Sequence, residues 1–224
     1  MGIRIRKKYE FTGKIKVISD PRVIGLHTLY QIKALKDFRD IKAGYLGGWI
    51  EKEENLSQEG DCWVYSNAMV FGNAKVYENA LIYDYAQVYG NAKVHSNAMV
   101  YGNAQVYGDA EVYDNAQVYG NAKVHGSAQV YGNAQVYDSA SIYGAANIYA
   151  NAEVYGNADV AGYAQVKATA KVYDVADLSG HAKILNDSQI CGRSVLKGRI
   201  EVRQKNLVLK DVYLESDDYE LSVF

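Results

Sequence analysis

Four histidines are the side chains of this sequence best suited to move protons near neutral pH, because imidazole titrates there. His27, His95, His125 and His181 are scattered along the chain, and none shares a short motif with a carboxylate. A general base must reach the proton that it removes. The spacing of these residues alone therefore predicts no catalytic site.

Metal, phosphate and disulfide chemistry lack the spacings that they need. Cys62 and Cys191 form no paired motif, and the histidines are too dispersed for a metal centre. We expect both thiols to be free, as in a reducing compartment. No glycine-rich turn leads into a helix with lysine, which argues against a phosphate-binding loop. We therefore predict no metal and no bound cofactor.

Charge divides the chain into two unlike parts. Residues 1–50 carry 11 Lys and Arg against 4 Asp and Glu, whereas residues 51–224 carry 13 against 22. A basic cluster in the first part could attract nucleic acid, but we favour a solvated basic end and expect no nucleic-acid partner. No apolar run reaches the roughly 18 residues of a membrane span, and no signal-peptide core is present. We expect a cytoplasmic protein without a membrane partner. The basic cluster consists of Arg4, Arg6, Lys7, Lys8, Lys14 and Lys16.

The elements that must position these residues follow from a six-residue repeat. The chain has 21 Tyr, 20 Gly and a single Pro, and an aliphatic residue recurs every six positions from Val64 to Ile190. Alanine usually stands two positions earlier, which gives the unit Ala-x-Val-Tyr-Gly-Asn. In an extended unit, Ala and Val point to one side, and x and Tyr point to the other. Gly-Asn corners exclude a helix and suit tight turns, since both residues tolerate the left-handed backbone region. The repeat predicts short strands stacked as the coils of a β-solenoid.

The repeat resembles a known family. The stretch Val100-Tyr101-Gly102-Asn103-Ala104-Gln105 is similar to the hexapeptide signature of left-handed parallel β-helix proteins, and Cys62-Trp63-Val64-Tyr65 resembles the YdcK-like branch of bacteria and phages. The resemblance implies an all-β, left-handed parallel β-helix with three hexads per coil and about eight coils. We predict an N-terminal β cap over residues 1–54, the solenoid over 55–199, and a C-terminal cap with an acidic tail over 200–224. Within the N-terminal cap, Tyr9–Ile18 and Thr28–Leu35 are the predicted strands.

The same resemblance implies one enzymatic hypothesis, an acyl-CoA-dependent acyltransferase that would use acetyl-CoA. His95 or His125 would be the base, because such enzymes generally use histidine. However, both residues replace Tyr in outward columns on different faces, and no inserted loop shapes a pocket. The sequence therefore favours a non-enzymatic role over this alternative.

Eighteen residues per coil would align the tyrosines in three outward columns, in which rings about 4.8 Å apart can stack. On the first face the column is unbroken, and Trp, Leu and Met stand beside its N-terminal end. Either the N-terminal cap or a second subunit must cover that end, and we favour self-association or a protein partner. The predicted interface residues are Trp63, Tyr65, Leu81, Tyr83, Met99, Tyr101, Tyr119, Tyr137, Tyr155 and Tyr173.

These observations favour a rigid, non-enzymatic scaffold that presents tyrosine faces to itself or to a protein partner. The phage members of the resembling branch add the hypothesis of a phage or prophage accessory protein. A module that stacks a nucleotide or sugar on tyrosine is a further alternative. The basic N-terminal cap and an acidic tail could also attract each other between molecules and give end-to-end assembly. That tail contains Asp211, Glu215, Asp217, Asp218 and Glu220.

Overall fold

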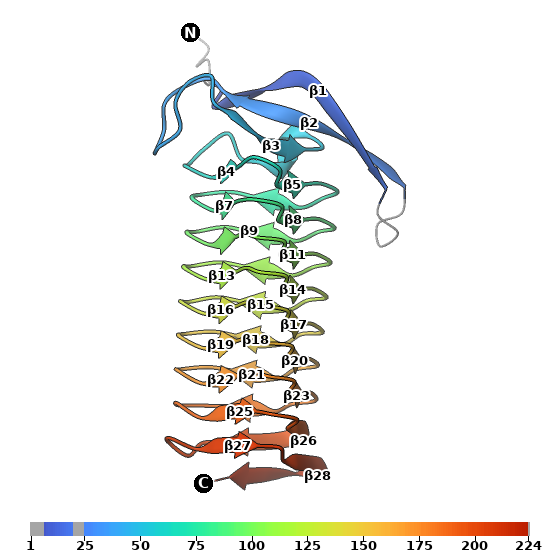
Figure 1. Ribbon diagram of the computed structural model, residues 1–224, viewed down its shortest axis with the longest axis vertical. Helices are drawn as coiled ribbons and strands as arrows, with labels where there is room; N and C mark the ends of the chain where they lie inside the picture. Colours follow the sequence, from blue (N-terminus) through green and yellow to red (C-terminus); the bar gives the residue numbers. More distant parts are fainter. Residues whose placement is uncertain (1–6, 20–24, 224) are drawn as a thin grey trace.

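The protein is a straight stack of β-coils with a small β-sheet at its N-terminal end (Figure 1). The computed structural model describes residues 7–19 and 25–223, with the backbone alone over 217–223. Arg4 and Arg6 of the basic cluster lie outside the described residues, as do the side chains of Asp217, Asp218 and Glu220. The predicted all-β parallel β-helix is confirmed.

Each coil contributes one short strand to each of three faces, and equivalent strands pair in parallel along the stack. Face 1 consists of β4 (Trp63–Val64), β7 (Leu81–Ile82), β10 (Met99–Val100), β13 (Gln117–Val118), β16 (Gln135–Val136), β19 (Glu153–Val154), β22 (Lys171–Val172), β25 (Gln189–Cys191) and β27 (Val208–Lys210). Face 2 consists of β3 (Leu46–Ile50), β5 (Met69–Val70), β8 (Gln87–Val88), β11 (Gln105–Val106), β14 (Lys123–Val124), β17 (Ser141–Ile142), β20 (Asp159–Val160), β23 (Asp177–Leu178) and the first parts of β26 (Val195–Val202) and β28 (Tyr213–Val223). Face 3 consists of β6 (Lys75–Val76), β9 (Lys93–Val94), β12 (Glu111–Val112), β15 (Gln129–Val130), β18 (Asn147–Ile148), β21 (Gln165–Val166), β24 (Lys183–Ile184) and the last parts of β26 and β28.

The stack contains about nine coils, one more than the sequence predicts. Pairs such as Met99 with Gln117 confirm the 18-residue coil. The extra coil arises because strands outside the regular hexads also join the ladders. At one end Trp49 of β3 pairs with Met69, and at the other Gln189 of β25 pairs with Val208 of β27. Both pairs depart from the 18-residue spacing, so counting hexads underestimates the stack.

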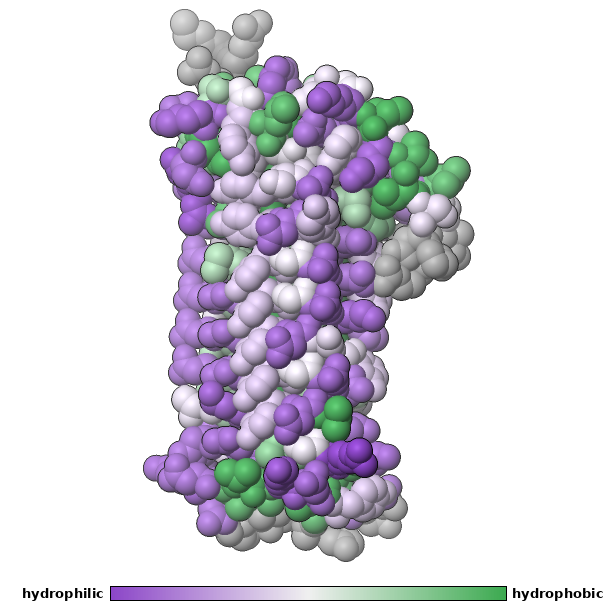
Figure 2. All heavy atoms as spheres, viewed as in Figure 1, coloured by the Kyte–Doolittle hydropathy of each residue, from purple (hydrophilic) through white to green (hydrophobic). Residues whose placement is uncertain are grey.

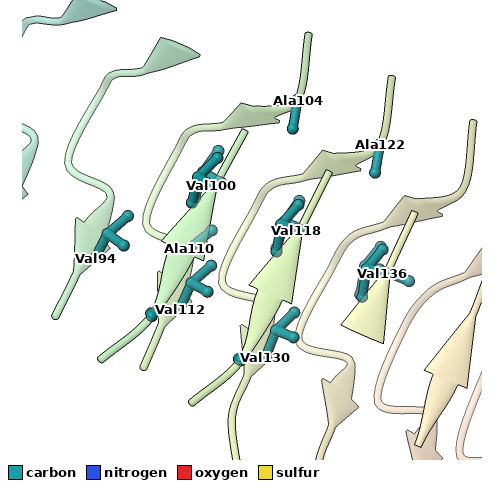
Figure 3. Packing of buried hydrophobic residues seen from close by; sticks show 14 of the residues in the cluster. Val94, Val100, Ala104, Ala110, Val112, Val118, Ala122, Val130 and Val136 are labelled. Carbon is teal, nitrogen blue, oxygen red and sulfur yellow. The ribbon is translucent and has the colours of Figure 1, made fainter. Parts of the chain in front are cut away.

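Alanine and valine fill the interior of the tube. Every inward Ala from Ala68 to Ala182 and every inward aliphatic residue from Val64 to Ile190 is buried. Figure 3 shows the labelled Val and Ala side chains aligned in rows from one coil to the next. Small side chains are needed because the narrow cross-section leaves room for few atoms, and close packing makes each methyl group count. The predicted inward register is therefore confirmed.

The corners use glycine and asparagine for different purposes. Glycines such as Gly90 and Gly102 have a φ of +70°, and a Cβ on Gly90 would lie 2.9 Å from the backbone nitrogen of Gly108 in the next coil. The asparagine that follows the corner residue, whether that residue is Gly102 or Ser96, does not adopt the left-handed region, contrary to the prediction. Instead its side chain bonds to its equivalent one coil on, as in the 3.2 Å contact from Asn97 Nδ2 to Asn115 Oδ1.

The N-terminal cap is an antiparallel sheet that merges with the parallel stack. The strands β1 (Tyr9–Ser19) and β2 (Leu26–Ala34) form a hairpin close to the predicted positions, and β2 pairs with β3. A short 3-10 helix (Glu53–Asn55) follows β3. The buried Lys8 ties the cap to the first coil, since its Nζ donates to the carbonyls of Glu59, Gly60 and Cys62 at 3.0–3.2 Å. None of the helices among the described residues is both long and apolar enough to cross a membrane.

Candidate interaction faces

Aromatic rings form stacked ladders on all three faces, as the columns predict. On face 1 the rings from Tyr101 to Tyr173 lie 4.7–4.9 Å apart and within 5° of parallel. Tyr65 and Tyr83 form a separate stacked pair at 4.4 Å. Between Tyr83 and Tyr101 the described rings do not stack, and a hollow of about 260 Å³ lies beside them. We call the continuous part, Tyr101 to Tyr173, ladder 1.

Hydrogen bonds fix the rings of ladder 1. The hydroxyl of Tyr101 donates to Gln117 Oε1 of the next coil at 3.1 Å, and Tyr119 donates to Gln135 in the same way. Tyr137 donates to a carboxylate oxygen of Glu153, also at 3.1 Å. Burial raises the pKa of Tyr137, and its bond to Glu153 raises the pKa further because it favours the neutral phenol. These bonds and stacks give ladder 1 a rigid, preorganised surface.

The N-terminal cap covers the adjoining end of face 1. Tyr9 and Phe38 meet Trp63 edge-on, with ring centroids 6.2 and 5.3 Å away. Tyr45 lies edge-on to Tyr65, whose hydroxyl donates to Asp40 at 3.2 Å. Trp63 is fully buried, Tyr65 is 8% exposed and Leu81 is 5% exposed.

Part of the predicted interface is buried within the chain itself. The N-terminal cap of the same chain packs on Trp63 and Tyr65, and these two residues and Leu81 are buried. Tyr83 and Met99 are half-buried and pack against the core. The predicted interface residues that extend beyond the cap are Tyr101, Tyr119, Tyr137, Tyr155 and Tyr173, all half-buried.

The hairpin covers the corresponding end of face 2. Leu29 of β2 packs with Phe71 and Tyr89, and all three side chains are buried. Ile18 and Trp49 pack against this cluster. The N-terminal ends of these two aromatic columns are thus covered by the chain itself. Farther along, the flank visible in Figure 2 is mainly hydrophilic.

The two candidate catalytic histidines lie in ladders on different faces. His95 is stacked between Tyr77 and Tyr113, and its Nε2 lies 3.3 Å from Glu111 Oε1. His125 is stacked between Tyr107 and Tyr143. Burial, with a smaller effect of Lys123, lowers the pKa of His125 and favours its neutral form.

The structure brings together a pair that sequence reasoning missed. His27 Nδ1 lies 2.8 Å from Glu51 Oε1, and Glu51 Oε2 accepts the backbone N–H of Gly72 at 2.7 Å. The Nε2 atom of His27 is buried without a hydrogen-bond partner. The two residues are 24 positions apart. They meet only because β2 folds back over the first coil, so no local motif could reveal them.

Other candidate chemistry remains dispersed. The thiols of Cys62 and Cys191 are both free and buried. Over residues 7–19 and 25–223, no three His, Cys, Asp or Glu side chains gather as metal ligands. His181 stacks on Tyr163 at 4.9 Å and, with Lys183 and Arg199, lines a hollow of about 270 Å³. The predicted absence of metal and cofactor stays a prediction.

The fold and its ladders define a parallel β-solenoid built on a six-residue repeat. The family model described as the YdcK beta solenoid repeat matches residues 104–120 and 128–144. A relative named "Uncharacterized acetyltransferase YdcK", from Escherichia coli (strain K12), is 51% identical over 55 residues. That match covers 24% of this chain and 17% of the relative. The resemblance to YdcK-like proteins is therefore confirmed.

Proposed function

We propose that this protein is a non-enzymatic scaffold that binds a protein partner or a second copy through ladder 1. The observation that carries this proposal is the way in which the N-terminal cap packs. The cap covers the N-terminal end of the face 1 aromatic column, and it places Phe38 edge-on to Trp63 and Tyr45 edge-on to Tyr65. A partner that offers aromatic side chains could cover ladder 1 in the same manner.

The energetics favour such a surface. Rings that are already stacked and hydrogen-bonded lose little conformational freedom on binding, which lowers the entropic cost of association. Tyrosine combines a large apolar ring with a polar tip and is common at interfaces for this reason. Beside ladder 1, Gln117 and Gln135 carry no charge, and Glu153 is paired with Lys171 at 2.9 Å. The face therefore needs little desolvation of unpaired charge.

The test compares matched substitutions on two faces. Tyr101→Lys with Tyr119→Lys changes ladder 1, whereas Tyr113→Lys with Tyr131→Lys makes the same change in the ladder of face 3. We expect the first pair alone to lower the mass in solution, measured by sedimentation, or to abolish photo-cross-links formed from position 137. Circular dichroism controls for folding. Equal behaviour of the two pairs, or no cross-links from position 137, would exclude ladder 1 as the interface.

Acetyl transfer is the second candidate, and two observations favour it. The relative is named an acetyltransferase, and burial keeps His125 in the neutral form that a general base requires. A thermal shift with acetyl-CoA that His125→Ala abolishes would favour this candidate. A shift that instead persists in that variant would exclude His125 as part of the binding site.

A further inference from the structure

One hydrogen-bonded sheet runs from the N-terminal cap to the far end of the stack. Its pairings pass from β1 through β2 and β3 to β5, then along face 2 to β26 and β28. Among the described residues, β1 pairs with β2 alone and β28 pairs with β26 alone. Both strands have 11 residues, whereas the strands from β5 to β23 between them have two each. Long edge strands with one unpaired side can accept a further strand.

The two edges carry opposite charge. Strand β1 contains Lys14 and Lys16, and its single acid, Glu10, is already paired with Lys33 at 2.7 Å. The sequence of β28 contains four acids and no base. Since opposite charges speed encounter and suppress wrong pairings, these edges fit each other better than either fits itself. The four acids are Glu215, Asp217, Asp218 and Glu220.

A β-bulge turns apolar side chains of β1 outward. The register with β2 shifts between Phe11 and Ile15, where Gly13 has a φ of +83°. Beyond the bulge, Lys16 lies over the Trp49 ring, whereas Ile15 and Val17 are 60% and 56% exposed. A regular strand would place Ile15 and Val17 on the same side as the buried Tyr9, yet both are exposed.

Exposed hydrophobic residues lie at the opposite end too. Val208 is 52% exposed and Tyr213, the first residue of β28, is 62% exposed. Figure 2 shows hydrophobic side chains gathered over the N-terminal hairpin and near the last coils, with a mainly hydrophilic flank between them. Apolar side chains and complementary charge therefore coincide at the two ends of this sheet, on β1 and at Tyr213 of β28, whereas Val208 lies in β27 of the separate face 1 sheet.

We propose that copies of this chain associate head to tail, with β1 of one copy pairing with β28 of the next. Two antiparallel pairings, β1 with β2 and β2 with β3, give β1 the same direction as the coil strands. A copy displaced along the stack thus brings its β1 parallel to β28 and continues the sheet. Because the two surfaces differ, the contact does not close on itself and yields chains of variable length. This inference does not depend on ladder 1.

Sedimentation velocity and light scattering of the whole chain test this inference. At low salt the average mass should rise steadily with concentration, and about 0.5 M salt should reverse the rise because it screens the charges. Lys14→Glu with Lys16→Glu, or Glu215→Lys with Glu220→Lys, should each weaken association at least about tenfold. An equimolar mixture of the two variants should regain pairwise association, since the unchanged basic edge of one variant then meets the unchanged acidic edge of the other. The single variant Lys14→Glu keeps the contact between Lys16 and Trp49. It should still weaken association, which shows that the effect does not come from misfolding of β1.

Matched controls separate this contact from others. Lys123→Glu makes the same charge change on the flank and should leave association unchanged. Tyr101→Lys with Tyr119→Lys can lower the mass through ladder 1, but it should leave the salt-sensitive rise of mass with concentration unchanged. Failure of the ladder 1 proposal and failure of this one are therefore distinguishable. A monomer at all concentrations, a fixed oligomer insensitive to salt, or a mixture that fails to regain association would each overturn the inference.

Discussion

Replacing Ala150 by glycine should stabilise the protein, although glycine usually destabilises ordered structure. Ala150 and Ala168 both have a φ of +60° at the corner position that glycine occupies in most coils. An L-residue there costs roughly 1–2 kcal/mol, whereas the freedom of glycine in the unfolded chain offsets roughly 0.5–1 kcal/mol of the gain. Each substitution should therefore raise the free energy of unfolding by about 0.5–1 kcal/mol, and the two together by about 1–2 kcal/mol.

Guanidinium unfolding and calorimetry measure this effect. The double substitution should raise Tm by about 2–4 °C per kcal/mol for a domain of this size. Ala152→Gly is the matched control, because Ala152 is fully buried and points inward. That substitution should destabilise the protein by roughly 1 kcal/mol through lost burial and added chain freedom. If Ala150→Gly also lowered stability, backbone strain at the corners could not be the reason for the abundance of glycine there.

Three further predictions concern the core, the N-terminal cap and the ladders. Val118→Ala should cost about 2 kcal/mol by leaving a cavity. The substitution Lys123→Ala, at an outward and exposed position, should change stability by less than about 0.5 kcal/mol in the same denaturation assay. Lys8→Met should lower the free energy of unfolding by about 1–3 kcal/mol, because carbonyls such as that of Cys62 lose a buried hydrogen-bond donor. Amide hydrogen exchange should become faster at Trp63 but not in distant coils. Burial, and to a smaller extent the neighbouring Tyr131 and acidic residues, raises the pKa of Tyr113 from 10.0 to about 12. Between pH 10 and 12 the tyrosine therefore ionises in the unfolded chain but not in the native protein. The free energy of unfolding should fall as the pH rises through this range. Absorbance at the tyrosinate band, compared with Tyr113→Phe, checks this, and a native Tyr113 that titrates near 10 would contradict it.

The repeat predicts much of the fold because the residue pattern within each hexad determines which side chains point inward and where the chain turns. Alternation separates inward Ala and Val from outward Tyr, and constant spacing aligns the columns. The role of asparagine escapes prediction, since Asn97 meets Asn115 only after the coils stack. The predicted number of coils is too low because β3 and β27 join the ladders without the hexad signature.

The candidate site is less predictable, because it depends on how the N-terminal cap folds over the stack. The sequence allows two covers for Trp63, a second subunit or the cap, and the cap occupies that position. The pairing of His27 with Glu51 depends on the same packing. The spacing of residues in the sequence does not reveal long-range contacts of this kind. It does reveal the ladders, because the same contact recurs between successive coils.

The constant coil length also governs how such a chain can change over evolutionary time. Loss or duplication of 18 residues would shorten or lengthen the rod by one coil and leave every remaining side chain on its own face. Insertion or deletion of a single hexad would instead move every later strand to the neighbouring face. Tyr119 and Tyr137 would then leave face 1 and align with the aromatic ladder of another face. Whole-coil duplication is thus a nearly neutral route to rods of different length, whereas change by single hexads would break all three columns at once.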